Sequence, residues 1–340
     1  MGCKYIIVIH GGAGVISKSN ISEEREKQFL KSLNGILSAS KKILRNGGTA
    51  LDAVQEAVRL LEEDELYNAG KGSVFTSKGT NEMDAGIMDG STLKCGAVAG
   101  VSTIRNPIVA ARAVMDHTNH ILLMGKGAEE FAQSKSIEIV EPSFFFTQNR
   151  YDQLLKAKDT NRVILDHDGE KLVKEEEKTL TVNISGDPIH PDSKMGTVGA
   201  VAIDKYGNLA AATSTGGMTN KMVGRVGDTP IIGAGVYANK MVAVSSTGTG
   251  EAFIRTLAAY DISALMEYGG LTLEEASKKV VMEKLIEQGK GDGGVITVDA
   301  NGNIAMPFNS EGMYRGYAIV NNNEENENND TIVVAIYKNE

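Results

Sequence analysis

A threonine at the start of an apolar segment is the residue best placed to do chemistry in this sequence. Residues 196–202 read GTVGAVA, and a backbone cut before Thr197 would give that residue both a hydroxyl and a free α-amine. An α-amine has a pKa of about 7.7–8, so part of it is neutral at pH 7 and can take the hydroxyl proton. Thr197 could then act as a nucleophile without a histidine or lysine, and Gly196 would tolerate the strained backbone of an N→O acyl shift. The alternative is that Thr197 is an ordinary strand residue.

Clustered glycines indicate a site built largely from main chain. The chain holds 38 glycines, and glycine is favoured where the backbone takes a positive φ or approaches another group closely. The clusters are HGGAG at 10–14, GKG at 70–72, GG at 216–217, GAG at 233–235, TGTG at 247–250 and GDGG at 291–294.

Helices are predicted where apolar residues recur at helical spacing behind a capping residue. The expected helices are 22–44, the segment after Thr49, the segment after Asn106 and the segment from Thr272 to Gly289. Thr49 with Asp52, and Thr272 with Glu275, have the spacing of capping boxes. Pro107 occupies the first helical position, where proline is tolerated.

Strands are predicted at 5–9 and in three pairs joined by turn residues. The pairs are 198–203 with 209–213, 295–298 with 304–308, and 316–320 with 331–337. Because several strands are apolar on both faces and are followed by helices, we expect a sheet covered on both sides. The polar tract 321–330 is expected to be a flexible hairpin tip, and the charged stretch 159–195 a mobile linker.

Composition excludes several classes of protein. The 340 residues carry a formal net charge of -9. The sequence shows no basic face of the kind that nucleic-acid-binding proteins carry, so no nucleic-acid partner is expected. No apolar run approaches the roughly 20 residues that cross a bilayer, so no membrane span is expected. Two cysteines, Cys3 and Cys95, cannot form a disulfide framework and no Cys/His cluster suggests zinc. A reducing compartment, and therefore the cytoplasm, is the expected location.

Six motifs occur in order along nearly the whole chain. They are HGGAG at 10–14, YNAGKGSV at 67–74, MDAGIMDG at 83–90, GTVGAVAIDKYGNLAAATSTGGMTNKMVGR at 196–225, GDTP at 227–230 and TGTGE at 247–251. Together they resemble the plant-type L-asparaginase/isoaspartyl aminopeptidase family, which are N-terminal nucleophile hydrolases. The likeness leaves out only the stretch 159–195 and the tip 321–330.

The resemblance implies a four-layer αββα sandwich and self-cleavage before Thr197. One domain, 1–340, would then consist of an α-subunit of residues 1–196 and a β-subunit of residues 197–340, which pair as (αβ)₂. The implied activity is hydrolysis of L-asparagine and of β-aspartyl dipeptides through an acyl-enzyme on Thr197. No cofactor is required for this chemistry.

The resemblance also assigns roles around the nucleophile. Thr215 matches the threonine whose hydroxyl supports Thr197, and Asn68 matches a residue that orients the nucleophile or the reacting carbonyl. The segment 10–14 is expected to be a loop, and its Gly11 and Gly12 match the glycine strip beside the scissile bond, where backbone rearrangement accompanies cleavage.

The expected substrates carry a free α-amine and α-carboxylate beside the amide to be cut. Arg225 offers a planar fork for the carboxylate, and Asp228 can receive the ammonium. Thr247 and Gly248 match the donors to the oxyanion, and these two residues together with Gly250 are expected to contact substrate. Main-chain N–H groups near a helix start favour negative charge.

A loop of main-chain carbonyls is expected to hold a structural sodium ion. The matching residues are Leu61, Glu62, Asp64, Tyr67, Ala69 and Lys71. Carbonyl ligands leave no side-chain pattern in a sequence, so this expectation comes from the resemblance alone.

Other interpretations remain at this stage. A lysosomal glycosylasparaginase needs a secretory signal and disulfides, and a threonine endopeptidase of the same fold carries larger insertions. A nucleotide-binding protein would need G-x-G-x-x-G spacing or a P-loop, which the glycine clusters lack. An uncleaved, inactive scaffold that acts as a binding module is a further alternative.

Overall fold

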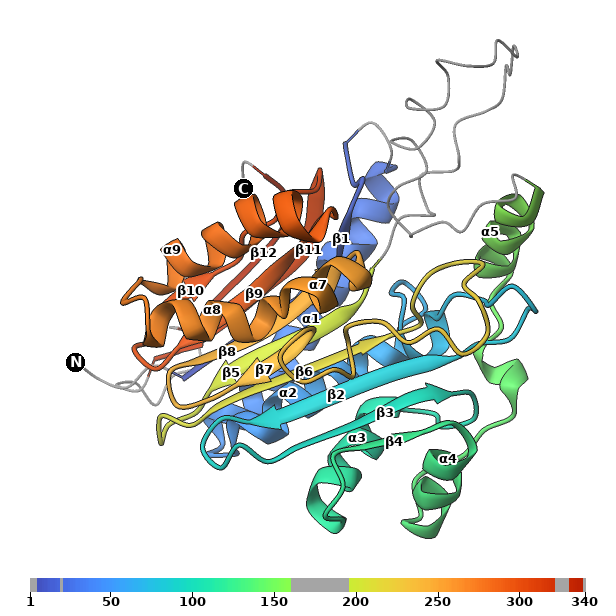
Figure 1. Ribbon diagram of the computed structural model, residues 1–340, viewed down its shortest axis with the longest axis horizontal. Coiled ribbons are helices and arrows are strands. Elements are labelled where there is room, and N and C mark those ends of the chain that lie inside the picture. Colours follow the sequence, from blue (N-terminus) through green and yellow to red (C-terminus); the bar gives the residue numbers. More distant parts are fainter. Residues whose placement is uncertain (1–4, 19–20, 160–195, 322–329, 339–340) are drawn as a thin grey trace.

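Two stacked β-sheets form the centre of the molecule, with helices on their outer faces (Figure 1). The computed structural model describes residues 5–18, 21–159, 196–321 and 330–338. The predicted αββα sandwich is therefore confirmed. Within the described residues, no helix has the length and hydropathy needed to cross a membrane.

The larger sheet is almost wholly antiparallel. Its strands are β1 (Tyr5–Gly14), β2 (Met83–Asp89), β3 (Cys95–Val101), β4 (Leu122–Met124), β5 (Val198–Ile203), β6 (Leu209–Thr215), β11 (Gly312–Val320) and β12 (Thr331–Tyr337). They pair in the order β12-β11-β1-β5-β6-β2-β3-β4, and only β3 and β4 are parallel. The segment that begins at Thr197 therefore lies at the centre of the sheet.

The smaller sheet pairs in the order β10-β9-β8-β7. Its strands are β7 (Val236–Ala238), β8 (Val242–Gly248), β9 (Gly293–Asp299) and β10 (Ile304–Ala305). It packs against the middle of the larger sheet, mainly through β8 and β9 on β1, β5 and β6.

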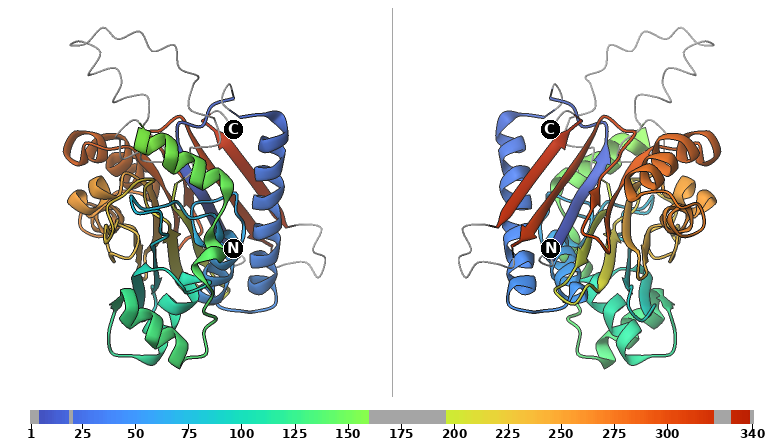
Figure 2. Two further views of the ribbon diagram at one scale, coloured as in Figure 1. Left: turned by 90° about the vertical axis from the view of Figure 1, so that its right-hand side faces the viewer. Right: turned by 90° about the vertical axis from the view of Figure 1, so that its left-hand side faces the viewer.

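Helices cover both outer faces (Figure 2). The larger sheet carries α1 (Glu23–Arg45), α2 (Ala50–Glu63), α3 (Pro107–His117) and α4 (Gly125–Ser134). The smaller sheet carries α7 (Gly250–Thr256), α8 (Ala258–Glu267), α9 (Leu273–Lys278) and the π-helix η4 (Lys279–Gly289). The remaining helical segments are α5 (Gln148–Asp159) and the short η1 (Gly70–Gly72) and η2 (Pro142–Phe145).

Local sequence signals explain most element boundaries. Both predicted capping boxes are present, with Thr49 accepting from the Asp52 amide and Thr272 from the Glu275 amide. The three predicted strand pairs are confirmed, although β10 is shorter than expected.

Two expectations need correction, and others cannot be checked. The motif at 10–14 is not a loop but the end of strand β1, because β11 pairs with it as far as Gly14. Asp159, the expected first linker residue, is the last residue of α5. The rest of the linker, 160–195, and the tip 322–329 lie outside the described residues, as does Cys3.

The space between the sheets is apolar at one end of the strands and polar at the other. Residues two apart on a strand share a face. On the face of each strand that is turned toward the other sheet, an apolar residue is followed by buried small or polar residues. In the larger sheet these are Val8 then His10 on β1, Val201 then Gly199 and Thr197 along β5, and Ala211 then Thr213 and Thr215 on β6. In the smaller sheet they are Ala243 then Ser245 and Thr247 on β8. The candidate nucleophile lies at the polar end.

Candidate active site

Thr197 and Thr215 meet at the polar end of β5 and β6. The antiparallel register pairs Val198 with Ser214, so Thr197 and Thr215 occupy the next position outward. The Thr197 hydroxyl donates to Thr215 Oγ1 at 3.1 Å, and Thr197 is 7% exposed. The two threonines that the resemblance singled out are thus in direct contact.

The turn that follows Thr215 is held by main-chain and amide hydrogen bonds. The Gly217 N–H donates to Thr215 Oγ1 at 2.9 Å. Asn68 accepts from the Gly216 N–H at its carbonyl (3.0 Å) and donates from Nδ2 to the Gly217 carbonyl (2.7 Å). Asn68 therefore fixes the turn that follows Thr215, and Thr215 in turn contacts Thr197.

The glycine strip lies directly against the scissile junction. A methyl group added at Gly12 would lie 2.5 Å from the Gly196 nitrogen, and Gly12 has φ +112°. A methyl group at Gly11 would lie 2.4 Å from the Tyr67 ring. The β1–β11 register shifts between His10 and Gly12, which marks a bulge at this point. Only glycine lets the two backbones approach this closely.

The TGTG loop closes the site from the smaller sheet. Thr247 Oγ1 accepts from the Ala13 N–H at 3.2 Å, which ties the loop to the glycine strip. Gly248 has φ +144°, and a methyl group there would lie 2.2 Å from the Asp292 carbonyl oxygen. Asp292 also accepts from the Thr249 hydroxyl at 2.9 Å. The candidate oxyanion donors therefore belong to a backbone that is fixed on two sides.

Arg225 and Asp228 converge, but they are not each other's closest ion-pair partner. Arg225 donates from Nε and Nη2 to both carboxylate oxygens of Glu251, at 3.0 and 2.9 Å. A methyl group added at Gly250 would lie 2.8 Å from Asp228 Oδ1 and 2.9 Å from Arg225 Nη2. Gly250 is thus the point where a cation and a buried acid meet.

The charges around this point are strongly perturbed by burial. Asp228 is 3% exposed, and among the described residues its Oδ2 has no hydrogen-bond partner. Burial raises the pKa of Asp228 to about 7, against the opposing effect of Arg225. Burial also raises the pKa of Asp84 and lowers that of Lys221, while each of these two groups favours the charged form of the other.

A layer of buried polar side chains from strands β1, β6 and β8 lies next to Thr197. His10 Nε2 lies 2.9 Å from Ser245 Oγ, which lies 2.7 Å from Thr213 Oγ1. Burial lowers the pKa of His10 to about 3, only partly offset by the main chain of Thr197, so the imidazole is neutral. Gly199, paired with His10 across β1 and β5, leaves the space that this layer fills.

The loop that the resemblance assigns to sodium follows α2. Glycines pack on its carbonyls: a methyl group at Gly70 would lie 2.3 Å from the Glu62 oxygen, and one at Gly72 2.0 Å from the Tyr67 oxygen. The Asp64 carbonyl accepts from the Tyr67 N–H at 3.2 Å. The described residues contain no group of three or more His, Cys, Asp or Glu that could hold a metal. A cation here would rely on main-chain oxygens.

The sequence argument missed several residues that contact the site. Glu251 was seen only as part of a motif, although its position after Gly250 places an acid beside the cation of Arg225. His10, Ser245 and Lys221 received no role. The alternation of apolar and polar residues on neighbouring strands is the signal that could have identified His10 and Ser245.

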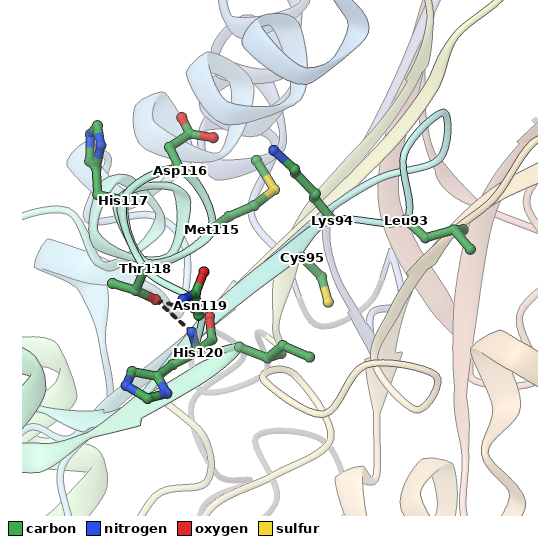
Figure 3. Close-up of a pocket in the computed structure, with 10 residues that line it drawn as sticks. Leu93, Lys94, Cys95, Met115, Asp116, His117, Thr118, Asn119 and His120 are labelled. Carbon is green, nitrogen blue, oxygen red and sulfur yellow. Dashed lines mark hydrogen bonds between the residues drawn. The ribbon is translucent and has the colours of Figure 1, made fainter.

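A separate cavity of about 490 Å³ lies beyond the predicted site (Figure 3). Side chains of β3, α3 and the segments next to them line it, including Cys95, Met115 and His120. Burial raises the pKa of the Cys95 thiol, which disfavours the reactive thiolate. None of the predicted site residues lines this cavity.

We predict that Gly199→Ala lowers the free energy of unfolding by about 1–3 kcal/mol, because its methyl group would lie 1.9 Å from Ser245 Oγ. Gly35→Ala is the matched control, since nothing lies within 4 Å of a methyl group there. Gly35 lies within helix α1, where alanine in its place should stabilise the protein by about 0.5–1 kcal/mol. Urea unfolding of both variants measures the difference, and equal effects would contradict the tight layer.

We also predict that the Asp228 carboxyl titrates near pH 7 in the intact chain. Glu251→Gln should lower this pKa, because it removes a negative charge that raises it. Carbon NMR of the aspartate carboxyls measures both values, with Asp228→Asn used to assign the resonance. A pKa near the ordinary aspartate value of about 3.9 would mean that Asp228 is well solvated or paired.

Comparison with known proteins places this arrangement in a family. The chain is 72% identical over 348 aligned residues to a Dictyostelium discoideum protein whose name combines isoaspartyl peptidase and L-asparaginase (99% of this chain, 100% of the relative). It is 57% identical to an isoaspartyl peptidase of Salmonella typhimurium (93% and 96%) and 41% identical to a plant-type L-asparaginase of Pyrococcus abyssi (90% and 94%). A family model described as asparaginase matches residues 3–327, and the chain belongs to that family.

Proposed function

We propose that this chain is a self-processing amidohydrolase. It hydrolyses L-asparagine to aspartate and ammonia, and it removes the β-aspartyl residue from β-aspartyl dipeptides. The observation that carries the proposal is Thr197 at the start of a central strand, its hydroxyl 3.1 Å from Thr215 and its preceding residue packed on Gly12. The names of the relatives support the substrates.

Maturation is self-cleavage of the peptide bond between Gly196 and Thr197. Thr197 Oγ1 attacks the carbonyl carbon of Gly196, the peptide C–N bond breaks, and the acyl group passes from nitrogen to oxygen. Water then hydrolyses the ester, which leaves a carboxylate on Gly196 and an α-amine on Thr197. The contact between Gly12 and Gly196 supports this step, because neither residue has a side chain that would block backbone rotation.

Hydrolysis uses the new terminus. The neutral α-amine takes the Oγ1 proton of Thr197 while the oxygen attacks the substrate amide. The TGTG loop supplies donors to the oxyanion, and one such donor is typically worth about 3–4 kcal/mol of barrier. Ammonia or an amino acid leaves with the proton, and water hydrolyses the ester on Thr197.

Substrate recognition follows from the charges at Gly250. The ionised carboxylate of Asp228 receives the α-ammonium, for which its partnerless Oδ2 is suited. Glu251 occupies the Nε and Nη2 side of Arg225, so the substrate carboxylate binds on the side of Nη1. A methyl group at Gly217 would lie 3.3 Å from this atom, so Nη1 lies beside the turn at Gly216 and Gly217, called the catalytic turn below.

The proposed enzyme is an assembly of two cleaved chains with a structural sodium ion, located in the cytoplasm. The products of cleavage are an α-subunit of residues 1–196 and a β-subunit of residues 197–340, assembled as (αβ)₂ and working without a cofactor. From the family resemblance the proposal also takes a structural sodium ion, held by main-chain carbonyls of the loop where Gly70 packs on the Glu62 carbonyl and Gly72 on the Tyr67 carbonyl; the ion would stabilise the loop that carries Asn68. Scarce cysteine supports a reducing, cytoplasmic location.

Thr197→Ala tests the nucleophile. We expect wild type to give two fragments on a denaturing gel, and the variant to give one full-length band with at least about a thousandfold less ammonia from asparagine. Thr331→Ala, on the outer strand β12, is the matched control and should behave as wild type. An active, uncleaved variant would overturn the mechanism, and an uncleaved, inactive wild type would favour a scaffold.

Asp228→Asn tests the ammonium site. We expect the KM for asparagine to rise about 30-fold or more with self-cleavage intact, because the substrate ammonium loses a buried charge partner. In wild type the KM should fall as pH rises through about 7, since Asp228 ionises there. Steady-state kinetics from pH 6 to 8 measure this dependence. A KM independent of pH over that range would rule out Asp228 as the ammonium partner.

A further inference from the structure

A second cavity adjoins the proposed zwitterion site. Its volume is about 390 Å³, within the range of small-molecule sites. The residues that line it are Met218, Lys221, Met222, Val223, Gly224, Arg225 and Glu251. Arg225 and Glu251 already belong to the proposed substrate site, whereas the three apolar side chains have no role in it.

The apolar wall of this cavity is exposed and held in place. Met222 is 75% exposed and Val223 46% exposed. The loop is anchored on both sides of them: the Ser77 N–H donates to the Lys221 carbonyl at 2.8 Å, and the Gly224 N–H to Glu82 Oε2 at 2.8 Å. Exposed apolar residues on a fixed backbone are suited to binding, because little ordering is needed.

The inner end of the cavity reaches the catalytic turn. A methyl group at Gly217 would lie 2.9 Å from Lys221 Nζ, and the Gly217 N–H donates to Thr215 Oγ1. Only the Thr215 hydroxyl then separates this turn from Thr197 Oγ1. A chain of contacts therefore joins Lys221, which lines the cavity, to Thr197, and it supports placing the group that leaves from the substrate amide in this cavity.

Lys221 adds a positive charge at that inner end. Its Nζ donates to the Glu82 carbonyl at 2.6 Å, which uses one of the three ammonium donors. Burial lowers the pKa of Lys221, and the carboxylate of Asp84 opposes this by favouring the charged ammonium. The cavity therefore combines an apolar wall with a buried cation.

We propose that this cavity binds the residue that leaves from β-aspartyl dipeptides, with its apolar side chain against Met222 and Val223 and its carboxylate toward Lys221. The proposal rests on the function proposed above and names its preferred substrates. Asparagine releases ammonia and makes no use of the cavity. A dipeptide with a large apolar second residue uses both parts of it.

The double variant Met222→Ser/Val223→Ser tests the apolar wall. We expect kcat/KM for β-aspartyl-leucine to fall about tenfold, with asparagine and β-aspartyl-glycine unchanged. Met124→Ser is the matched control, since Met124 is 69% exposed on the distant strand β4, and it should leave all three substrates unchanged. Equal losses on all three substrates, or no loss on leucine, would overturn the proposal.

The carboxylate contact has its own test. We expect wild type to prefer β-aspartyl-leucine over its C-terminal amide, and Lys221→Met to abolish that preference. If Lys221→Met does not fold, the wild-type preference decides alone. Equal rates for acid and amide would rule out Lys221 as the carboxylate partner.

Failure of the proposed function is distinguishable from failure of this inference. If wild type turns over none of these substrates, the proposed function fails. Calorimetry with the same dipeptides then tests whether the cavity binds the second residue. Tighter binding of β-aspartyl-leucine than of β-aspartyl-glycine by wild type, lost in the double variant, supports it, and equal binding refutes it.

Discussion

The close approach of two backbones at Gly12 and Gly196 is the constraint on which the rest of the site depends. Strand β1 pairs with β5 as far as His10 and Gly199, and the bulge beyond that point brings Gly12 onto the residue before Thr197. No side chain fits between them, so the junction is held by main-chain packing alone. Because β6 lies on the other side of β5, the same register delivers Thr215 to the hydroxyl of Thr197. Strand pairing thus sets the positions of Thr197, Thr215 and the peptide bond at which we propose cleavage.

Burial then decides which groups carry charge. The neutral imidazole of His10 and the hydroxyls of Ser245 and Thr213 form a layer that satisfies most of its polar atoms internally, and it adds no charge beneath Thr197. Glu62 behaves similarly on the outer face of the sheet: burial raises its pKa to about 8 while it accepts from the Ser214 hydroxyl. Charged groups are concentrated instead around Gly250. Neutral polar groups therefore surround Thr197, the proposed nucleophile, and the charged groups lie where we propose that the substrate binds.

Sequence patterns were sufficient for the layers, the helix caps and the strand pairs, because capping boxes and alternation are local. Motif order also brought forward Thr197 and Thr215, which the structure places in contact, and Arg225 and Asp228, which converge at Gly250; their roles stay predictions. They did not identify Glu251 as the partner of Arg225, since an ion pair between residues 26 positions apart depends on how the TGTG loop folds back. The motif at 10–14 was taken as a loop, because clustered glycines indicate turns. Pairing with β11 and β5 overrides that preference.

The pairing of Arg225 with Glu251 leaves Asp228 able to take the role that we propose for it, the recognition of a zwitterion. If Arg225 were bound to Asp228, both substrate charges would have to break an existing ion pair. Glu251 satisfies one side of the guanidinium instead, which leaves Asp228 buried with one oxygen that accepts no hydrogen bond from a described residue. An unpaired buried carboxylate is unfavourable, which is why its pKa rises toward 7. In the proposed complex an arriving ammonium favours the ionised form, because it supplies the charge partner that the buried carboxylate lacks. A ligand with a carboxylate and no ammonium gains nothing from Asp228. We therefore propose that the site selects α-amino acids through Asp228, one oxygen of which has no hydrogen-bond partner among the described residues.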